Sequence, residues 1–454
     1  MNDSKVKFRR YDLRLSLSKK EFLVIQELQK NPLISYTELA KRLRTDLKNI
    51  RRIIKKLSSF DEEGSQEEDR QKRQGKRTPL NFYAVFDYTM LGLRAVNFLV
   101  ECKNEEEMRV AEYFCDVHPY TFFRTRIFGG SFRGLFVKYH VPPTGFAFIE
   151  EAYQRLQSEG LISNYRVIIN NDVIAQETVP DISAYDPIDQ EWNFSLEEFD
   201  NHLKWIRARD TPFLMSGKPR SLSHLGRLDI FDIMILREWS YGAGPRKSNN
   251  EVLSNILSDE LRIYHDYSKC DGLCENLSCR GLDVDRYLVA KRKNKLQELD
   301  LITGYGIGFD RKKVSLFNRY LFIGKTDKIF LQKLSVSLEK GYFPFTSVLG
   351  IDEPAGDDSL ITFYWWVESP PRQSNDFVTW LFERTVEVQV YVVSNEFDHS
   401  SRYELYHENF VAHAVDPTNP WRVDEQYCLT TPINEILRVA KQKGIKGEEK
   451  VEGN

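Results

Sequence analysis

Apolar residues recur at helical spacing near the start of the chain. Phe22, Ile25 and Leu28 lie on one stripe within residues 17–31, and Pro32 stands where the pattern stops. Apolar positions three or four residues apart share one face of an α-helix, and proline is common where a helix ends. The pattern therefore predicts a short amphipathic helix over residues 17–31.

Two more helices are predicted before residue 60. Ser35 precedes Glu38 at the spacing of a capping box, so the second helix is expected to begin after Ser35. Thr45 or Asp46 is expected to cap the third helix. Three short helices in succession, the last of them basic, are typical of a helix-turn-helix. The predicted apolar stripe of the third helix consists of Leu47, Ile50, Ile54 and Leu57.

The pattern changes after a charged stretch at residues 61–78, which lacks apolar periodicity and is predicted to be a loop. A strand is expected at residues 82–87. The order strand, helix, strand, strand, helix, strand then follows, which is the ferredoxin-like arrangement. Its elements are expected at residues 95–102, 105–115, 120–128, 132–141, 146–158 and 165–169.

The same order recurs further along the chain. A helix at residues 228–239 is followed by Ser248 and Glu251, which repeat the capping box, and by a basic helix at 284–299. The second copy has about 26 more residues than the first between its second and third helices, and about 16 fewer after the third; a recurring order of this kind indicates an internal repeat. The repeated βαββαβ elements are expected at residues 319–323, 328–339, 346–351, 360–368, 375–384 and 386–393.

The sequence thus predicts an α+β chain in which two winged helix-turn-helix domains alternate with two ferredoxin-like domains about a pseudo-twofold axis. The connectors repeat as well, because residues 184–187 before Trp192 resemble residues 414–417 before Trp421. The expected units are residues 15–60 (first winged helix-turn-helix), 61–79 (charged loop), 80–180 (first ferredoxin-like domain), 181–225 (connector with a helix), 226–310 (second winged helix-turn-helix, with an insertion at about 257–283), 311–396 (second ferredoxin-like domain), 397–442 (C-terminal extension) and 443–454 (disordered tail).

Residues 34–43, ISYTELAKRL, with the basic helix behind them, resemble the winged-helix domain of transcription regulators of the Lrp/AsnC type. Residues 300–310, DLITGYGIGFD, are similar to the wing and hinge of that family, and both βαββαβ segments match the order of its regulatory domain. The resemblance implies a DNA-binding regulator whose regulatory domains pair through their sheets. Here the pairing partner is expected within the same chain. The resemblance also implies a small-molecule effector and a homodimer of such pseudo-dimers.

A net charge of −3 gives the chain no overall attraction for nucleic acid, so a DNA-binding surface must be a local cluster of cations. The third helix supplies one, because no acidic residue lies between Lys48 and Lys56. Lysine and arginine neutralise phosphates, while arginine and asparagine read base edges in the major groove. The residues predicted to contact double-stranded DNA are Lys48, Asn49, Arg51, Arg52 and Lys55 in the first copy, and Arg286, Tyr287, Lys291, Arg292 and Lys295 in the second.

Three cysteines fall within the insertion of the second copy. Cys270, Cys274 and Cys279 follow His265, and three thiolates with one imidazole can complete a tetrahedral zinc site. The same thiols could instead hold an iron–sulfur cluster or act as a redox sensor. The remaining interpretation is that they are ordinary reduced thiols of an intracellular protein.

The sequence contains no Gly-rich phosphate loop and no nucleophile or metal-hydrolase motif, so the chain is predicted not to be an enzyme. No apolar run approaches the ~20 residues that span a bilayer, and no signal peptide is evident. We therefore expect a cytoplasmic, nucleoid-associated protein without a membrane partner. The predicted function is that of a sequence-specific, double-stranded DNA-binding transcription regulator. Two alternatives stay open: a tetrapyrrole enzyme similar to siroheme decarboxylases, which resemble Lrp-type regulators in both domains, and an architectural chromatin protein with little sequence preference.

Overall fold

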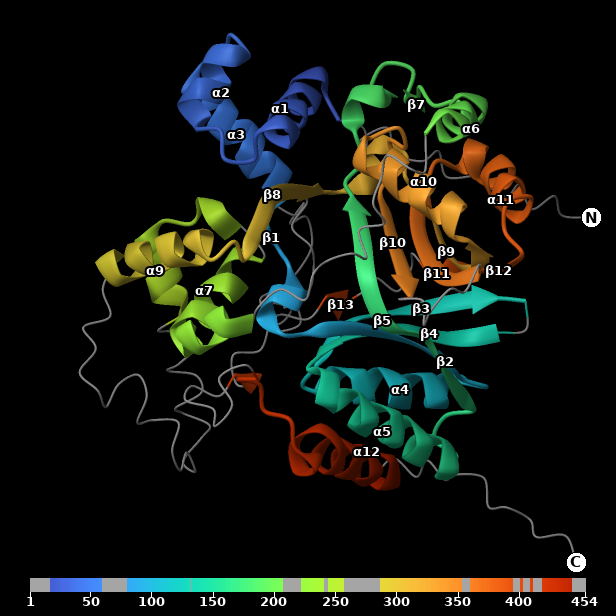
Figure 1. The fold of residues 1–454 in the computed structure, drawn as a ribbon. Coiled ribbons are helices and arrows are strands. Elements are labelled where there is room, and N and C mark those ends of the chain that lie inside the picture. Colours follow the sequence, from blue (N-terminus) through green and yellow to red (C-terminus); the bar gives the residue numbers. More distant parts are fainter. Residues whose placement is uncertain are drawn as a thin grey trace, which may run out of the picture.

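The chain folds into two groups of helices and one large antiparallel sheet that has helices on its outer face (Figure 1). The fold is of the α+β class, as predicted, and begins with a helix-turn-helix. The computed structural model describes residues 17–58, 80–130, 132–206, 222–240, 244–256, 286–352, 360–394, 401–402, 409–410 and 419–442.

The first helical unit consists of α1 (Lys19–Lys30), α2 (Tyr36–Arg42) and α3 (Leu47–Ser58). Ser35 caps α2 and Asp46 caps α3, as the sequence predicts, while Ser18 caps α1. Each cap accepts a hydrogen bond from a backbone amide of the first turn, which would otherwise have no partner within the helix. The apolar stripes of the three helices meet in one core, whose fully buried members include Val24, Ile25, Leu28, Leu39 and Ile50.

The second helical unit consists of α7 (Ile230–Trp239), a helical segment at residues 249–256, and α9 (Arg286–Glu298). The capping box predicted at Ser248 is confirmed. The Ser248 amide donates to Glu251 Oε2 over 2.6 Å, and the Glu251 amide donates to Ser248 Oγ over 3.2 Å. The unit packs around the fully buried side chains of Ile233, Val252, Val289 and Leu296.

A two-stranded ribbon joins the two helical units. It pairs β1 (Leu80–Phe86) with β8 (Ile302–Phe309) in antiparallel register, although these strands lie far apart in the sequence (Figure 1). Gly306 lies close to the opposite strand, since a Cβ atom there would lie 2.6 Å from Tyr83 Cζ and would displace that ring. Its strands contact α1 and α3 on one side and α7 on the other. The ribbon therefore fixes the two helical units to each other.

The large sheet is built from two successive groups of elements with the order βαββαβ. The first group is β2 (Arg94–Glu101), α4 (Glu105–Val117), β3 (Thr121–Gly129), β4 (Phe132–Val141), α5 (Phe146–Ser158) and β5 (Asn164–Thr178). The second group is β9 (Asn318–Asp327), α10 (Lys328–Glu339), β10 (Ser347–Asp352), β11 (Leu360–Ser369), α11 (Ser374–Phe382) and β12 (Glu387–Val393).

Within the sheet, the strands of the first group are ordered β5-β2-β4-β3 and those of the second group β12-β9-β11-β10. The two groups meet where β10 pairs with β5. They meet again where β12 pairs with β3, opposite Phe128 and Ile127, so the sheet closes on itself as a barrel. A short strand, β13 (Ser401–Arg402), adds to β3 beside this junction. Closure leaves most strands with hydrogen-bonded neighbours on both sides.

Residues alternate between the two faces of the sheet, as Trp365 and Trp366 on β11 illustrate. Trp365 is fully buried against Phe322, Phe343 and Phe377 on the face that α10 and α11 cover. Trp366 packs on the opposite, inner face. That inner cluster draws on strands of both groups and contains Leu99, Ile127, Phe136, Leu321, Ile323, Tyr364, Trp366, Tyr391 and Val393.

The segment that follows each group packs against the other group. After β5, Trp192 donates its indole N–H to the Val314 carbonyl over 2.7 Å, and α6 (Leu196–Trp205) contacts α10. After β12, Trp421 donates its indole N–H to the Leu91 carbonyl over 2.6 Å, and α12 (Thr431–Gln442) contacts α4 and α5. The two groups are therefore interlocked by their connectors as well as by the sheet.

Candidate nucleic-acid interface

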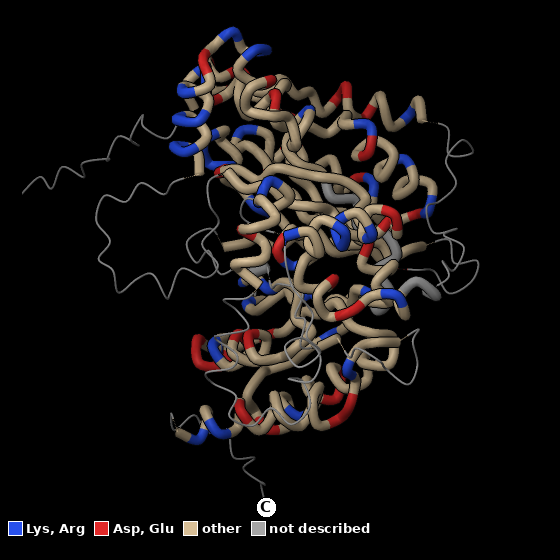
Figure 2. The backbone as a smooth tube through the Cα atoms, turned by 90° about the vertical axis from the view of Figure 1, so that its left-hand side faces the viewer, with Lys and Arg blue, Asp and Glu red and all other residues tan. Residues whose placement is uncertain are grey.

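Four cations form the outward face of α3, which we call the α3 basic face. Lys48, Arg51, Arg52 and Lys55 are all exposed, whereas Ile50 on the opposite side of the helix is fully buried. In Figure 2 lysine and arginine are concentrated at the top of the molecule, where α1–α3 lie in Figure 1. The amphipathic pattern of the helix thus directs its positive charge to solvent and its apolar stripe to the core.

The predicted base reader Asn49 is half-buried and already engaged within α3. Its side-chain amide donates to Asp46 Oδ2 over 3.2 Å, and its oxygen accepts a bond of 2.8 Å from Arg52 Nη2. Arg52 is therefore held beside Asn49 at the first turns of the helix. A guanidinium and an amide placed together at the start of such a helix suit hydrogen bonding to base edges.

The turn before α3 adds cations that the sequence analysis did not select. Lys41 and Arg44 are exposed at the end of α2, and Arg44 has a positive φ of 49°. An L-residue adopts this left-handed conformation at a cost of roughly 1–2 kcal/mol, and glycine is the usual choice there. Their location at the turn of a predicted helix-turn-helix could have marked both residues in the sequence as possible DNA contacts.

An internal ion pair positions α3 on α1. Lys56 Nζ lies 2.7 Å from Glu21 Oε1, and Glu21 is 5% exposed. Burial alone would raise the pKa of Glu21, but the hydrogen bonds from Lys56 and Ser18 hold that pKa below its usual value. Glu21 is also the third residue of α1, where its carboxylate completes the capping box with Ser18. Lys56, although its side chain is 70% exposed, is therefore engaged by α1 and is not counted in the α3 basic face.

The structure separates the five α9 residues that are predicted to contact DNA. Arg286, Tyr287 and Lys291 are exposed. Arg292 and Lys295 are instead directed at α7: Arg292 Nη2 lies 2.6 Å from Asp229 Oδ2, and Lys295 Nζ lies 2.6 Å from Asp232 Oδ2. Asp232 is fully buried, so its carboxylate depends on these cations. The sequence could not indicate this use, because α7 lies far from α9 along the chain.

A third cation of α9, Lys293, is also turned inward. Its Nζ lies 5.1 Å from the centre of the Trp239 ring and 3.5 Å from the Lys247 carbonyl oxygen. Burial, together with the nearby Lys247 charge, lowers the pKa of Lys293 to about 8, against the opposing effect of Glu251. Lys293 is thus a packing residue, although it belongs to a basic run in the sequence.

Arg246 connects the two helical units. It lies in the turn after α7 and donates to the Pro32 carbonyl over 2.8 Å and to the Ile34 carbonyl over 2.6 Å, both in the turn between α1 and α2. Its guanidinium also stacks over the rings of Tyr36 and Phe82, at 4.9 and 4.5 Å from their centres. No local sequence signal marks this residue, because all its partners are remote in sequence.

The metal site predicted at His265, Cys270, Cys274 and Cys279 lies outside the described residues. Among the residues that are described, no group of three or more histidine, cysteine, aspartate or glutamate side chains is placed to hold a metal ion. The cysteines in that part of the chain, Cys102, Cys115 and Cys428, are buried thiols. Burial raises the pKa of Cys115 to about 12 and that of Cys428 to about 11, so both remain protonated at neutral pH. Nor does any helix in the described segments have the length and apolar character needed to cross a membrane.

Comparison with known proteins gives the class of the N-terminal unit first. Residues 17–59, which contain α1–α3, match the family model of the winged helix-turn-helix DNA-binding domain. The match confirms the predicted class of this domain, and thereby the DNA-binding character of the region that carries the α3 basic face. No curated protein matches the chain in sequence.

Three solved structures to which the chain is similar are described next. The siroheme decarboxylase NirDL is similar over 93% of this chain and 99% of its own, with 10% identity and a TM-score of 0.44. An AsnC family transcriptional regulator from Agrobacterium tumefaciens is similar over 33% of this chain and 88% of its own, with 16% identity and a TM-score of 0.23. A regulatory protein of the AsnC family from Pyrococcus furiosus covers 33% of this chain and 87% of its own, with 15% identity and a TM-score of 0.22.

One prediction is corrected by these comparisons. The sequence predicts that the chain is not an enzyme, because it lacks recognised catalytic motifs. That prediction is contradicted, since the solved structures that are similar over more than nine-tenths of the chain are of an enzyme, the siroheme decarboxylase NirDL. The absence of a contiguous motif does not exclude catalysis, because catalytic side chains are recognised by their geometry and can come from distant parts of a sequence.

Proposed function

We propose that the chain is a sequence-specific transcription regulator that binds double-stranded DNA through α3. The α3 basic face carries this proposal: four exposed cations on one side of a capped helix, within a domain of the winged helix-turn-helix class. Cations on such a face neutralise phosphates and contribute most of the affinity, while Arg52 and Asn49 stand where base edges are read. A small-molecule effector and further association into a homodimer remain predictions.

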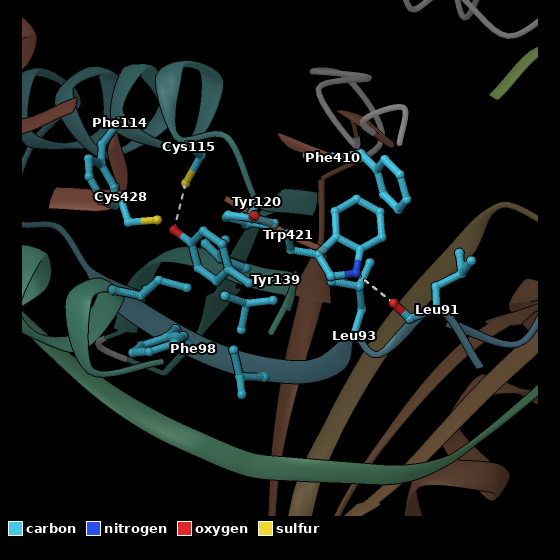
Figure 3. Packing of buried hydrophobic residues seen from close by; sticks show 14 of the residues in the cluster. Leu91, Leu93, Phe98, Phe114, Cys115, Tyr120, Tyr139, Phe410, Trp421 and Cys428 are labelled. Carbon is cyan, nitrogen blue, oxygen red and sulfur yellow. Dashed lines mark hydrogen bonds between the residues drawn. The ribbon is translucent and has the colours of Figure 1, made fainter. Parts of the chain in front are cut away.

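We also propose that the chain is an internal pseudo-dimer of Lrp/AsnC type, with two ferredoxin-like domains. Three observations support this interpretation. Both βαββαβ groups have the same strand order in the sheet. The ribbon pairs β1 with β8, each of which directly precedes its group. Trp192 and Trp421 each donate to a carbonyl in the short turn that precedes the opposite group, and Figure 3 shows Trp421 beside Leu91.

Fluorescence anisotropy with labelled duplexes tests the DNA-binding proposal. Sites would first be found by mapping bound DNA across the genome. The double variant Arg51→Ala/Arg52→Ala is expected to lose specific binding at moderate salt. If both residues contact phosphates, the slope of log K against log [salt] should become shallower by about 2, since each contact contributes roughly 0.9.

A matched control removes the same charge from the same domain. Lys19 and Lys20 are exposed on α1 and do not belong to the α3 basic face, so Lys19→Ala/Lys20→Ala should leave the salt slope unchanged. Equal losses in both double variants would mean that only overall charge matters. Specific binding that persists in Arg51→Ala/Arg52→Ala would show that α3 is not the DNA-contacting helix.

The same preparations distinguish the two alternatives. An architectural chromatin protein would bind the mapped sites little better than random duplexes, whereas specific proteins usually favour their site by about 10³-fold or more. A tetrapyrrole enzyme would bind its substrate with strong visible absorbance, which can be followed in a titration of the purified chain with an iron-loaded uroporphyrin.

A further inference from the structure

The two helical units have an ion pair at the same place, between the start of the first helix and the third helix. In the first unit the third residue of α1, Glu21, completes a capping box and binds Lys56 of α3 over 2.7 Å. In the second unit the third residue of α7, Asp232, completes a capping box and binds Lys295 of α9 over 2.6 Å. The pairs therefore give a structural register between α3 and α9 in which Lys56 corresponds to Lys295.

This register is consistent with the buried positions of both helices. It places Ile50 opposite Val289 and Leu57 opposite Leu296, and all four of these side chains are buried. The outward positions, in contrast, differ in charge. Lys48, Arg51, Arg52 and Lys55 of the α3 basic face correspond to Tyr287, Ala290, Lys291 and Asn294 of α9. Only one of the four outward positions is a cation in α9.

The remaining cations near the middle of α9 have structural partners. Arg292 stands at the position of the buried Ile53 and binds Asp229 and Asp232 of α7. Lys293 lies over the Trp239 ring. Either side chain would have to leave a carboxylate or an aromatic partner before it could neutralise a phosphate. Breaking a buried ion pair in this way is costly, because a desolvated carboxylate is left behind.

The second helical unit instead contacts the first unit at the turn between α1 and α2. Arg246 donates to two carbonyls of the α1–α2 turn and stacks on Tyr36, the first residue of α2. The β1–β8 ribbon contacts both units as well. These contacts fix the orientation of the first unit on the body of the protein.

We propose that only the first helical unit contacts DNA and that the second unit is a scaffold that orients it. This inference rests on the proposed function. It assigns one half-site to each chain, whereas two equivalent reading helices within one chain would require two half-sites about one helical turn apart.

Two matched double variants of the full-length chain test the assignment. Arg51→Ala/Arg52→Ala removes two cations of the α3 basic face, and Arg286→Ala/Lys291→Ala removes two exposed cations of α9. Circular dichroism and the midpoint of urea unfolding would first be measured to check that both variants are folded. Anisotropy at several salt concentrations should show a slope reduced by about 2 for the α3 pair and unchanged for the α9 pair.

Hydroxyl-radical footprinting gives an independent readout on a mapped site. We expect one continuous protected stretch for each bound chain, and the Arg286→Ala/Lys291→Ala variant should protect the same nucleotides as the wild type. Two protected stretches separated by a helical turn for a single bound chain, or an equal reduction of the salt slope in both variants, would overturn the single-unit assignment while leaving DNA binding intact. A wild-type chain that binds no duplex would refute the proposed function, and the single-unit assignment with it.

Discussion

Replacing Lys293 by methionine should stabilise the protein at neutral pH. Lys293 is half-buried in α9, where it contacts the Trp239 ring at 5.1 Å and donates a long hydrogen bond of 3.5 Å to the Lys247 carbonyl. Burial lowers its pKa from 10.5 to about 8, so its charged form is less stable in the folded protein than in the unfolded chain. Methionine keeps most of the side-chain length and carries no charge.

The magnitude follows from the pKa difference. One pKa unit corresponds to 1.36 kcal/mol, so the difference sets an upper limit of roughly 3 kcal/mol. Residual solvent access and the lost interaction with the Trp239 ring, about 0.5–1 kcal/mol, reduce the expected gain to about 1–2 kcal/mol. Between pH 8 and 10.5 the unfolded chain binds more protons at this lysine than the folded protein does. The wild type should therefore gain stability as pH rises through that window.

Urea unfolding of the wild type and Lys293→Met at pH 7, 8, 9 and 10 measures this effect. Subtracting the free energy of unfolding of the wild type from that of Lys293→Met removes the pH dependence of the groups that both proteins share. The remaining difference should be constant below pH 8 and should become smaller above it. Lys291→Met, which changes an exposed lysine of the same helix, should show no such pH dependence. A Lys293→Met variant less stable than the wild type at pH 7, or a difference independent of pH, would refute the reasoning.

Two further predictions concern the connectors and the first helical unit. Trp192→Phe and Trp421→Phe each remove an indole N–H from a buried carbonyl, so each should lower the free energy of unfolding by about 1–3 kcal/mol in urea titrations; a loss below about 0.5 kcal/mol would contradict the importance of these bonds. Although burial alone would raise the pKa of Glu21, its hydrogen bonds with Lys56 and Ser18 hold that pKa below the usual value. The ionised carboxylate therefore contributes fully to the free energy of unfolding above the unfolded-state pKa of about 4.3. This contribution is lost as the pH falls through the lower folded-state pKa. The stability difference between the wild type and Glu21→Gln should therefore be larger at pH 6 than at pH 3, and an equal difference at both would show that the carboxylate charge is unimportant.

Local signals were sufficient to predict most elements of the fold. The bounds expected at residues 132–141, 146–158 and 328–339 coincide with β4, α5 and α10. These elements are marked by side chains near them in sequence, such as apolar runs, caps and turn residues. The cap at Ser35 and the capping box at Ser248 fall in the same class, because a cap contacts the first turn of its own helix.

Long-range partners could not be predicted in the same way. Nothing in the sequence of β1 specifies β8 as its neighbour, and nothing in β12 specifies β3, because pairing depends on how the whole chain folds. The basic run of α9 illustrates the consequence for function. Its charge pattern alone indicates a DNA-contacting surface, but Asp232 and Trp239 on α7 engage three of its cations.

A single chain with two helical units can divide binding and support between them. In a homodimer every substitution in the DNA-contacting helix appears in both subunits, so a residue such as Arg292 in place of Ile53 would alter both helices. Within one chain, α9 can direct Arg292 and Lys295 toward α7 while α3 retains its basic face. Arg246 of the second unit then holds the first unit in place, because it binds the turn between α1 and α2. The proposed asymmetry of DNA contact therefore follows from which unit has its cations engaged within the fold.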